Sequence, residues 1–83
     1  MPDIKVLILG GGCTKCRTLE ERVRAVAAAH QLPVDVAKVT DLQEIMNYGV
    51  LMTPGLIIAG EVKSVGTIPK DELLLGWLKG ASS

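Results

Sequence analysis

The sequence is poor in aromatic residues and carries no net charge. Of its 83 residues only Tyr48 and Trp77 are aromatic, and there is no Phe. Proteins that bind single-stranded nucleic acid stack bases on aromatic side chains, and non-specific binders rely on excess positive charge. With 9 basic and 9 acidic residues the formal net charge is +0. The composition therefore argues against a protein that binds nucleic acid or a membrane surface.

Long hydrophobic runs are also absent. No apolar stretch approaches the ~20 residues needed to span a bilayer, and the segment Met1–Lys5 lacks the pattern of an export signal. We therefore expect a cytoplasmic protein with no membrane partner. The length allows a single domain over residues 1–83. Its core is expected to cover about residues 3–80, followed by a short disordered tail, Ala81–Ser83.

Cysteine is scarce as well, since the chain has only Cys13 and Cys16. A disulfide that closes so short a loop would contribute only about 2 kcal/mol, and a reducing cytoplasm would break it. A structural staple is therefore the weaker explanation. The spacing alone leaves two others open, a reversible dithiol–disulfide pair and a metal site with two thiolate ligands.

Hydrophobic periodicity predicts an α/β fold with the order β-α-β-α-β-β-α. Strands are predicted at Ile4–Leu9, Val34–Val39, Leu56–Ile58 and Glu61–Val65. Helices are predicted at about 13–31, at about 41–48, and from Pro69 to near Gly80. Met46, on the second helix, is expected to pack into the core.

The cysteines fall where a buried strand passes through Gly10–Gly12 into a helix. The first N–H groups of a helix lack intrahelical partners and carry the positive end of its macrodipole. A sulfur at Cys13 is therefore favoured as the thiolate, and Lys15 adds a positive charge nearby. Cys16 lies one helical turn further on, within disulfide distance. This placement makes Cys13 the attacking thiol and Cys16 the resolving thiol, unless Cys13 only caps the helix.

The glycines before the helix have two explanations. A glycine loop at a helix start can cradle phosphate, but Gly10–Gly12 lack both the G-x-G-x-x-G spacing and the Lys-Ser/Thr of a P-loop. We expect instead a turn with positive φ that keeps the thiols accessible.

A second motif is the stretch Tyr48–Ile58, in which a helix end and Tyr-Gly-Val precede a short loop, Thr53-Pro54 and an apolar strand. Together with the Gly-Gly-Gly-Cys-Thr-Lys-Cys opening, it resembles the thioredoxin superfamily, and most closely its small, glutaredoxin-sized group of redox-active disulfide proteins. The resemblance covers about residues 3–80. It implies a thioredoxin-like fold with a four-stranded mixed sheet flanked by three helices, and a cis Thr53–Pro54 bond that faces the cysteines.

The resemblance also implies a thiol–disulfide oxidoreductase, with Cys13 as nucleophile and Cys16 as resolving thiol. The residues expected to border the substrate groove or to tune the nucleophile are Gly12, Thr14, Lys15, Thr53 and Pro54. No metal and no cofactor is implied beyond the redox-active pair itself. Disulfide-containing proteins would be the substrates of a monomer, and a separate flavin-containing donor similar to thioredoxin reductase would supply the electrons.

The sequence departs from the larger thioredoxins around the motif. Gly12 stands where they have Trp, and Thr14-Lys15 stands where they have Gly-Pro. The strand Ile4–Leu9 has no acidic residue, so the buried carboxylate that assists proton transfer in the larger proteins has no counterpart. The proton path and the partner reductase stay open on these grounds.

The alternative function is a carrier of a soft metal, copper or zinc, that uses the same two cysteines. Small metal carriers usually have a Met shortly before the first Cys, where this chain has Gly11 and Gly12. They also run β-α-β-β-α-β, whereas this chain is predicted to end in a helix. A scaffold or regulator that uses the fold without turnover is a third class.

Overall fold

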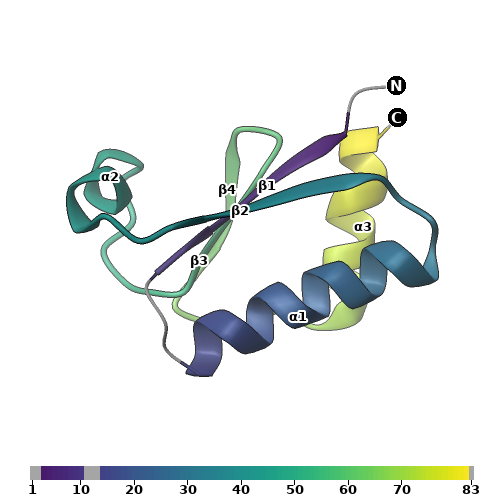
Figure 1. Ribbon diagram of the computed structural model, residues 1–83, viewed down its shortest axis with the longest axis horizontal. Helices are drawn as coiled ribbons and strands as arrows, with labels where there is room; N and C mark the ends of the chain where they lie inside the picture. Colours follow the sequence, from purple (N-terminus) through teal and green to yellow (C-terminus); the bar gives the residue numbers. More distant parts are fainter. Residues whose placement is uncertain (1–2, 11–13, 83) are drawn as a thin grey trace.

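The computed structural model describes residues 3–10 and 14–82 of the chain. Seven elements follow one another in the predicted order (Figure 1). They are β1 (Ile4–Leu9), α1 (Thr14–Ala29), β2 (Val34–Val39), α2 (Leu42–Asn47), β3 (Gly55–Ile58), β4 (Glu61–Val65) and α3 (Asp71–Ser82). The predicted α/β class and element order are confirmed.

The four strands form one mixed sheet with the order β2-β1-β3-β4. β1 pairs parallel with β2 and antiparallel with β3, and β3 pairs antiparallel with β4. β1 therefore lies between two neighbours, which explains why its sequence is almost entirely apolar. The first helix begins beyond the carboxyl end of this strand.

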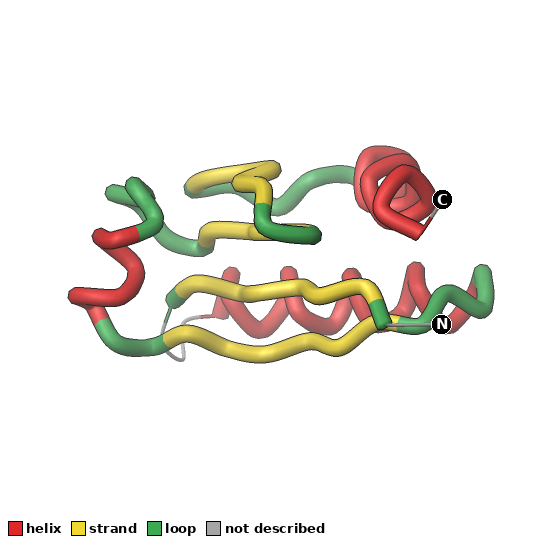
Figure 2. Tube along the Cα trace, turned by 90° about the horizontal axis from the view of Figure 1, so that it is seen from above, coloured by secondary structure: helices red, strands yellow, loops and turns green. Residues whose placement is uncertain are grey.

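One face of the sheet carries the main core. Side chains alternate along a strand, and every second residue of β1 points to the face that α1 and α3 cover. The buried residues of this core are Ile4, Val6, Ile8, Leu19, Val23, Val26, Ala27, Leu56, Ile58, Leu74 and Leu78. Figures 1 and 2 show α2 apart from this layer, at the opposite end of the molecule from α3.

The other face carries a small core of Leu9, Ile45, Val50 and Ile57. Glycine at position 55 allows the close approach, because a Cβ there would lie 3.0 Å from the Val50 Cγ1 atom and 3.3 Å from the Leu9 Cβ atom and would push them apart by a few tenths of an ångström. Through this close approach, the connector that leads from α2 to β3 packs onto the sheet.

The helix ends differ from the prediction by one or two residues. α3 begins at Asp71 rather than at Pro69, and the amides of Leu73 and Leu74 donate hydrogen bonds to the Lys70 carbonyl. The helix also continues through Gly80 to Ser82. Gly80 stays outside the positive-φ region in which glycine ends a helix.

Two sequence expectations are therefore wrong. The predicted disordered tail is helical at Ala81 and Ser82, and Ser83 lies outside the described residues. Met46 is 51% exposed instead of packed in the core, because the six-residue α2 buries only Ile45. Within residues 3–10 and 14–82, no helix is long and apolar enough to cross a membrane.

Candidate functional site

The candidate site is built around Gly10, at the carboxyl end of β1. The backbone of Gly10 has a φ of +139°, and its amide donates a hydrogen bond of 2.9 Å to the Val39 carbonyl of β2. A Cβ at this position would lie 2.6 Å from the Cys16 Sγ atom and 3.1 Å from the Thr53 Cβ atom. Cys16 and Thr53 are far apart in the sequence, yet both side chains pack against the Cα atom of Gly10.

Thr53 and Pro54 form the second side of the site. The peptide bond between them is cis. Thr53 is exposed, whereas the Pro54 side chain is fully buried and its carbonyl accepts a hydrogen bond of 2.8 Å from the Gly66 amide. The preceding residues are apolar and exposed, 85% for Leu51 and 62% for Met52. An open apolar surface therefore leads up to Thr53.

Cys16 forms the first side of the site, on the opening turn of α1. It is disulfide-bonded, and only 5% of its surface is exposed. A cavity of about 180 Å³ lies beside it, lined by Ile8, Gly10, Cys16, Arg17 and Lys38. Two basic residues, Arg17 and Lys38, therefore line the same cavity as Cys16.

Lys38 is itself held by an acidic partner on α1. Its ammonium lies 3.1 Å from one carboxylate oxygen of Glu20, and the other oxygen accepts two hydrogen bonds from the Arg24 guanidinium, at 3.0 and 3.1 Å. The hydrogen bond from Lys38, followed by that from Arg24, lowers the pKa of Glu20 below its ordinary value of 4.5. Glu20 is thus held as a carboxylate that fixes the position of Lys38 at the edge of the cavity.

The structure places the other predicted residues as follows. Thr14 and Lys15 occupy the first two positions of α1, and both are exposed. Cys13, the predicted nucleophile, and Gly12 lie outside the described residues. The described part of the site therefore joins Cys16 to Thr53 and Pro54, with Thr14 and Lys15 on the surface of the same helix end.

The architecture and the sequence both match known proteins. A protein-family model described as a thioredoxin domain matches residues 3–79. The chain belongs to the thioredoxin family. A thioredoxin of Methanothermobacter thermautotrophicus is 29% identical over 69 residues, which cover 83% of this chain and 90% of that protein. A thioredoxin of Methanocaldococcus jannaschii is 32% identical over 76 residues, which cover 92% and 87% respectively.

A solved structure supports the same family. The solution structure of reduced MJ0307 superposes with a TM-score of 0.59 at 25% sequence identity, over 95% of this chain and 98% of that one. Family membership, together with two relatives named thioredoxin, supports a thioredoxin-like redox function for this chain.

Sequence reasoning missed two residues of this thioredoxin-like site, Arg17 and Lys38. Arg17 follows Cys16 directly in the sequence, on the first turn of α1. Lys38 reaches the site because β1 and β2 pair in a register that sets Ile8 beside Lys38. The polar positions of the alternating strand Val34–Val39 were the available signal, but only the pairing register tells which of them lies next to Cys16.

The metal alternative depends on residues that could add ligands to the two cysteines. Among the residues that the structure describes, no group of three or more His, Cys, Asp or Glu side chains could hold a metal ion. His30, the only histidine, lies just beyond the far end of α1 from Cys16.

Proposed function

We propose that the chain is a thiol–disulfide oxidoreductase that reduces disulfides through a reversible Cys13–Cys16 pair. The observation that carries this proposal is the meeting of Cys16 and Thr53 at Gly10, at the carboxyl end of β1. A buried sulfur thereby lies beside an exposed, apolar stretch of chain, and that stretch offers a docking place for a substrate.

In the proposed reaction the Cys13 thiolate attacks one sulfur of a substrate disulfide. A mixed disulfide forms, and the other substrate sulfur leaves as a thiolate. Cys16 then loses its proton and attacks the Cys13 sulfur, which releases the second substrate thiolate and leaves Cys13–Cys16 oxidised. The substrate gains two electrons and, in water, two protons.

The charges near Cys16 support its part as the resolving thiol. Burial in an apolar surrounding disfavours a thiolate, whereas the cations of Arg17 and Lys38 at the same cavity favour it. We propose that these two side chains stabilise the Cys16 thiolate electrostatically, while its proton leaves to water. Lys15, on the exposed side of the same turn, would tune Cys13.

The exposed stretch before Pro54 is the proposed contact for substrates. Leu51 and Met52 present apolar surface, and the exposed Thr53 offers its backbone to an extended segment of a disulfide-containing protein. Gly12 and Thr14 would border the same groove. Because no bound cofactor takes part in these steps, a separate flavin-containing reductase would return the two electrons to the oxidised pair.

The proposal is tested with insulin as the disulfide substrate and dithiothreitol as the reductant. The native chain should accelerate insulin reduction, and Cys13→Ser should abolish the effect because the nucleophile is lost. Cys16→Ser should instead accumulate a covalent adduct with insulin, seen by mass spectrometry under non-reducing conditions, because the mixed disulfide is not resolved. Normal turnover by Cys16→Ser would contradict the assigned roles.

A parallel titration of the reduced chain with zinc separates the metal alternative. An oxidoreductase should show a reversible two-electron couple in the range of about −180 to −300 mV. Tight, stoichiometric zinc binding by a chain without such a couple would overturn the redox proposal and favour a carrier.

A further inference from the structure

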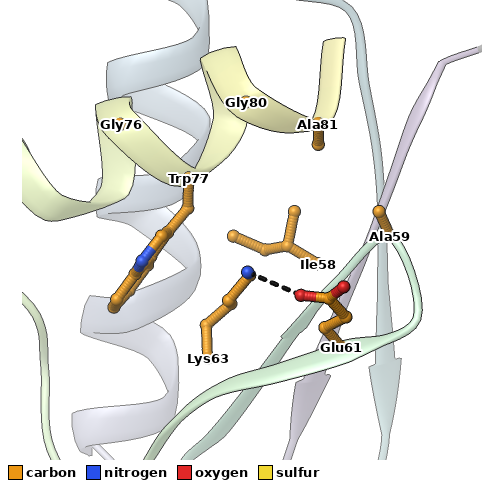
Figure 3. A pocket seen from close by; sticks show the side chains of 8 residues that line it. All are labelled: Ile58, Ala59, Glu61, Lys63, Gly76, Trp77, Gly80 and Ala81. Carbon is orange, nitrogen blue, oxygen red and sulfur yellow. Dashed lines mark hydrogen bonds and ion pairs between the residues drawn. The ribbon is translucent and has the colours of Figure 1, made fainter. Parts of the chain in front are cut away.

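A second and larger cavity lies between α3 and the β3–β4 hairpin, away from Cys16. Its volume is about 440 Å³, within the range of about 300–1,000 Å³ that is typical of small-molecule sites. Figure 3 shows its lining, in which α3 forms one wall and the hairpin the other. The residues that line it are Ile58, Ala59, Glu61, Lys63, Gly76, Trp77, Gly80 and Ala81.

The cavity is independent of the proposed redox site. It lies at the end of β3 that Ile58 forms, whereas Pro54 precedes the opposite end of the same strand. Four residues of extended chain span about 13 Å. A molecule in this cavity would therefore leave the groove at Thr53 open.

The helical wall is open because two of its residues, Gly76 and Gly80, lack side chains. Glycine is among the least favourable residues in a helix interior, and close packing often explains its presence. Packing does not explain it at these two positions, because a Cβ at either glycine would meet nothing within 4 Å. They lie four residues apart and therefore on one face of α3. Because they have no side chains, the space beside Trp77 stays open.

The groups at this cavity that can bind a ligand are an aromatic ring and an ion pair. Trp77 is partly buried against the main core, and in Figure 3 its ring stands beside the Lys63 side chain. The ammonium of Lys63 lies 2.8 Å from the Glu61 carboxylate. The two partners differ in exposure, 25% for the Lys63 side chain and 74% for that of Glu61. Lys63 is therefore the more buried of the two charges, although both residues line the cavity.

We propose that this cavity binds a small aromatic monoanion, whose ring packs along Trp77 between Gly76 and Gly80 and whose carboxylate pairs with Lys63. A planar ring gains from contact with an indole face, and a carboxylate is the natural second partner of a half-buried ammonium. The Glu61 side chain, which is 74% exposed, would give up its ion pair with Lys63 and turn into solvent when the ligand binds. The carbonyl end of α3 also borders the cavity, and it favours cations. The experiment therefore has to test which sign of ligand charge the cavity prefers.

The probe is 2-naphthoate, with 2-naphthylmethanol and 2-naphthylmethylamine as its neutral and cationic counterparts. Trp77 is the only Trp of the chain, so its indole N–H gives a single side-chain signal in a ¹⁵N-correlated NMR spectrum of the full chain. We expect saturable shifts of this signal with 2-naphthoate. The alcohol should bind about tenfold more weakly, the factor that corresponds to one hydrogen bond between charged groups.

Three variants locate the binding. Lys63→Met should reduce the affinity for 2-naphthoate to that for the alcohol and leave the alcohol unaffected. Lys70→Met removes the same charge from an exposed position outside the cavity and should change neither. Gly76→Leu fills the cavity and should weaken all ligands, and far-UV circular dichroism checks that it stays folded.

Several results would overturn the proposal. One is the lack of a saturable shift with 2-naphthoate. Another is tighter binding of the amine than of the carboxylate, which would show that the cavity prefers cationic ligands. Equal affinity of native chain and Lys63→Met for 2-naphthoate would show that the anion does not meet Lys63. Each result leaves the disulfide chemistry of Cys13 and Cys16 untouched, so the two proposals fail or stand separately.

Discussion

The two faces of the sheet are covered to very different extents. On one face α1 and α3, of 16 and 12 residues, bury a continuous core from Ile4 to Leu78. On the other face, among the residues that the structure describes, the six-residue α2 and its connector help to bury a core of four side chains, Leu9, Ile45, Val50 and Ile57. The difference indicates a division of tasks. The first face holds the fold together, whereas the second anchors the segment that carries Thr53 and Pro54.

The prediction with the largest effect addresses the first face. Leu74→Ala should destabilise the fold by about 2–5 kcal/mol, because it leaves a cavity in the main core. Leu74 is completely buried, whereas the neighbouring Leu73 is 52% exposed. Leu73→Ala should therefore change the free energy of unfolding by no more than about 0.5 kcal/mol. Urea denaturation measures both, and similar losses would refute the assignment of the core to this face.

The next prediction concerns Gly10, the residue against which Cys16 and Thr53 pack. Gly10→Ala should cost about 1–3 kcal/mol, because the new methyl group would overlap the Cys16 Sγ atom. It should also slow insulin reduction, since Cys16 or Thr53 must move. Gly60→Ala is the control, because Gly60 has a φ of +84° with open space around it. If the control slows the reaction equally, backbone strain rather than the contact with Cys16 is responsible.

A smaller loss of stability is expected on the second face. Val50→Ala removes two methyl groups from the small core and should cost about 1–2 kcal/mol. If this face anchors the connector, insulin reduction by Val50→Ala should fall more than that by Leu74→Ala under conditions in which both are folded. Leu42→Ala, at a 68% exposed position on α2, is the control and should change neither stability nor rate. If Val50→Ala reduces insulin at the native rate, the proposed division of tasks between the two faces is contradicted.

The smallest effect is the pH-dependent one. Ion pairs with Lys38 and Arg24 lower the pKa of Glu20 in the folded chain, so their contribution is present above the ordinary value of 4.5 and is lost as pH falls through the lowered pKa. Glu20→Gln should therefore reduce stability at pH 7 by less than about 1 kcal/mol. The difference from the native chain should vanish in acid. Glu21→Gln, which removes the same charge from an exposed neighbouring position, is the matched control.

Local patterns were sufficient to predict most of the fold. The strands Ile4–Leu9, Val34–Val39 and Glu61–Val65 have the predicted ends, because alternation and β-branched residues mark a strand without reference to its neighbours. The end of α3 was not predictable in this way. A glycine stops a helix only when it adopts a positive φ, and residue identity alone does not determine whether Gly80 does so.

The two motifs of the site were predictable from the sequence, but the way in which its residues are arranged in space was not. The sequence pointed to Cys16 and to Thr53-Pro54 separately, and the resemblance to thioredoxins implied that they meet. That Gly10 is the residue between them depends on long-range pairing, as does the approach of Lys38 to Cys16. The exposure of Met46 was missed for a similar reason, because periodicity does not show how little of the sheet a short helix covers.

The two edge strands carry features that limit edge-to-edge association of this small sheet with other chains. β2 and β4 both have an unpaired edge, which in principle is a template for a strand of another chain. β2 carries the exposed charges Asp35 and Lys38. In β4 the register shifts opposite Leu56 and Ile57 and leaves Lys63 as an extra residue, which distorts the edge as a β-bulge does. Neither edge is both flat and apolar, so the sheet does not offer a long, regular edge to a strand of another chain.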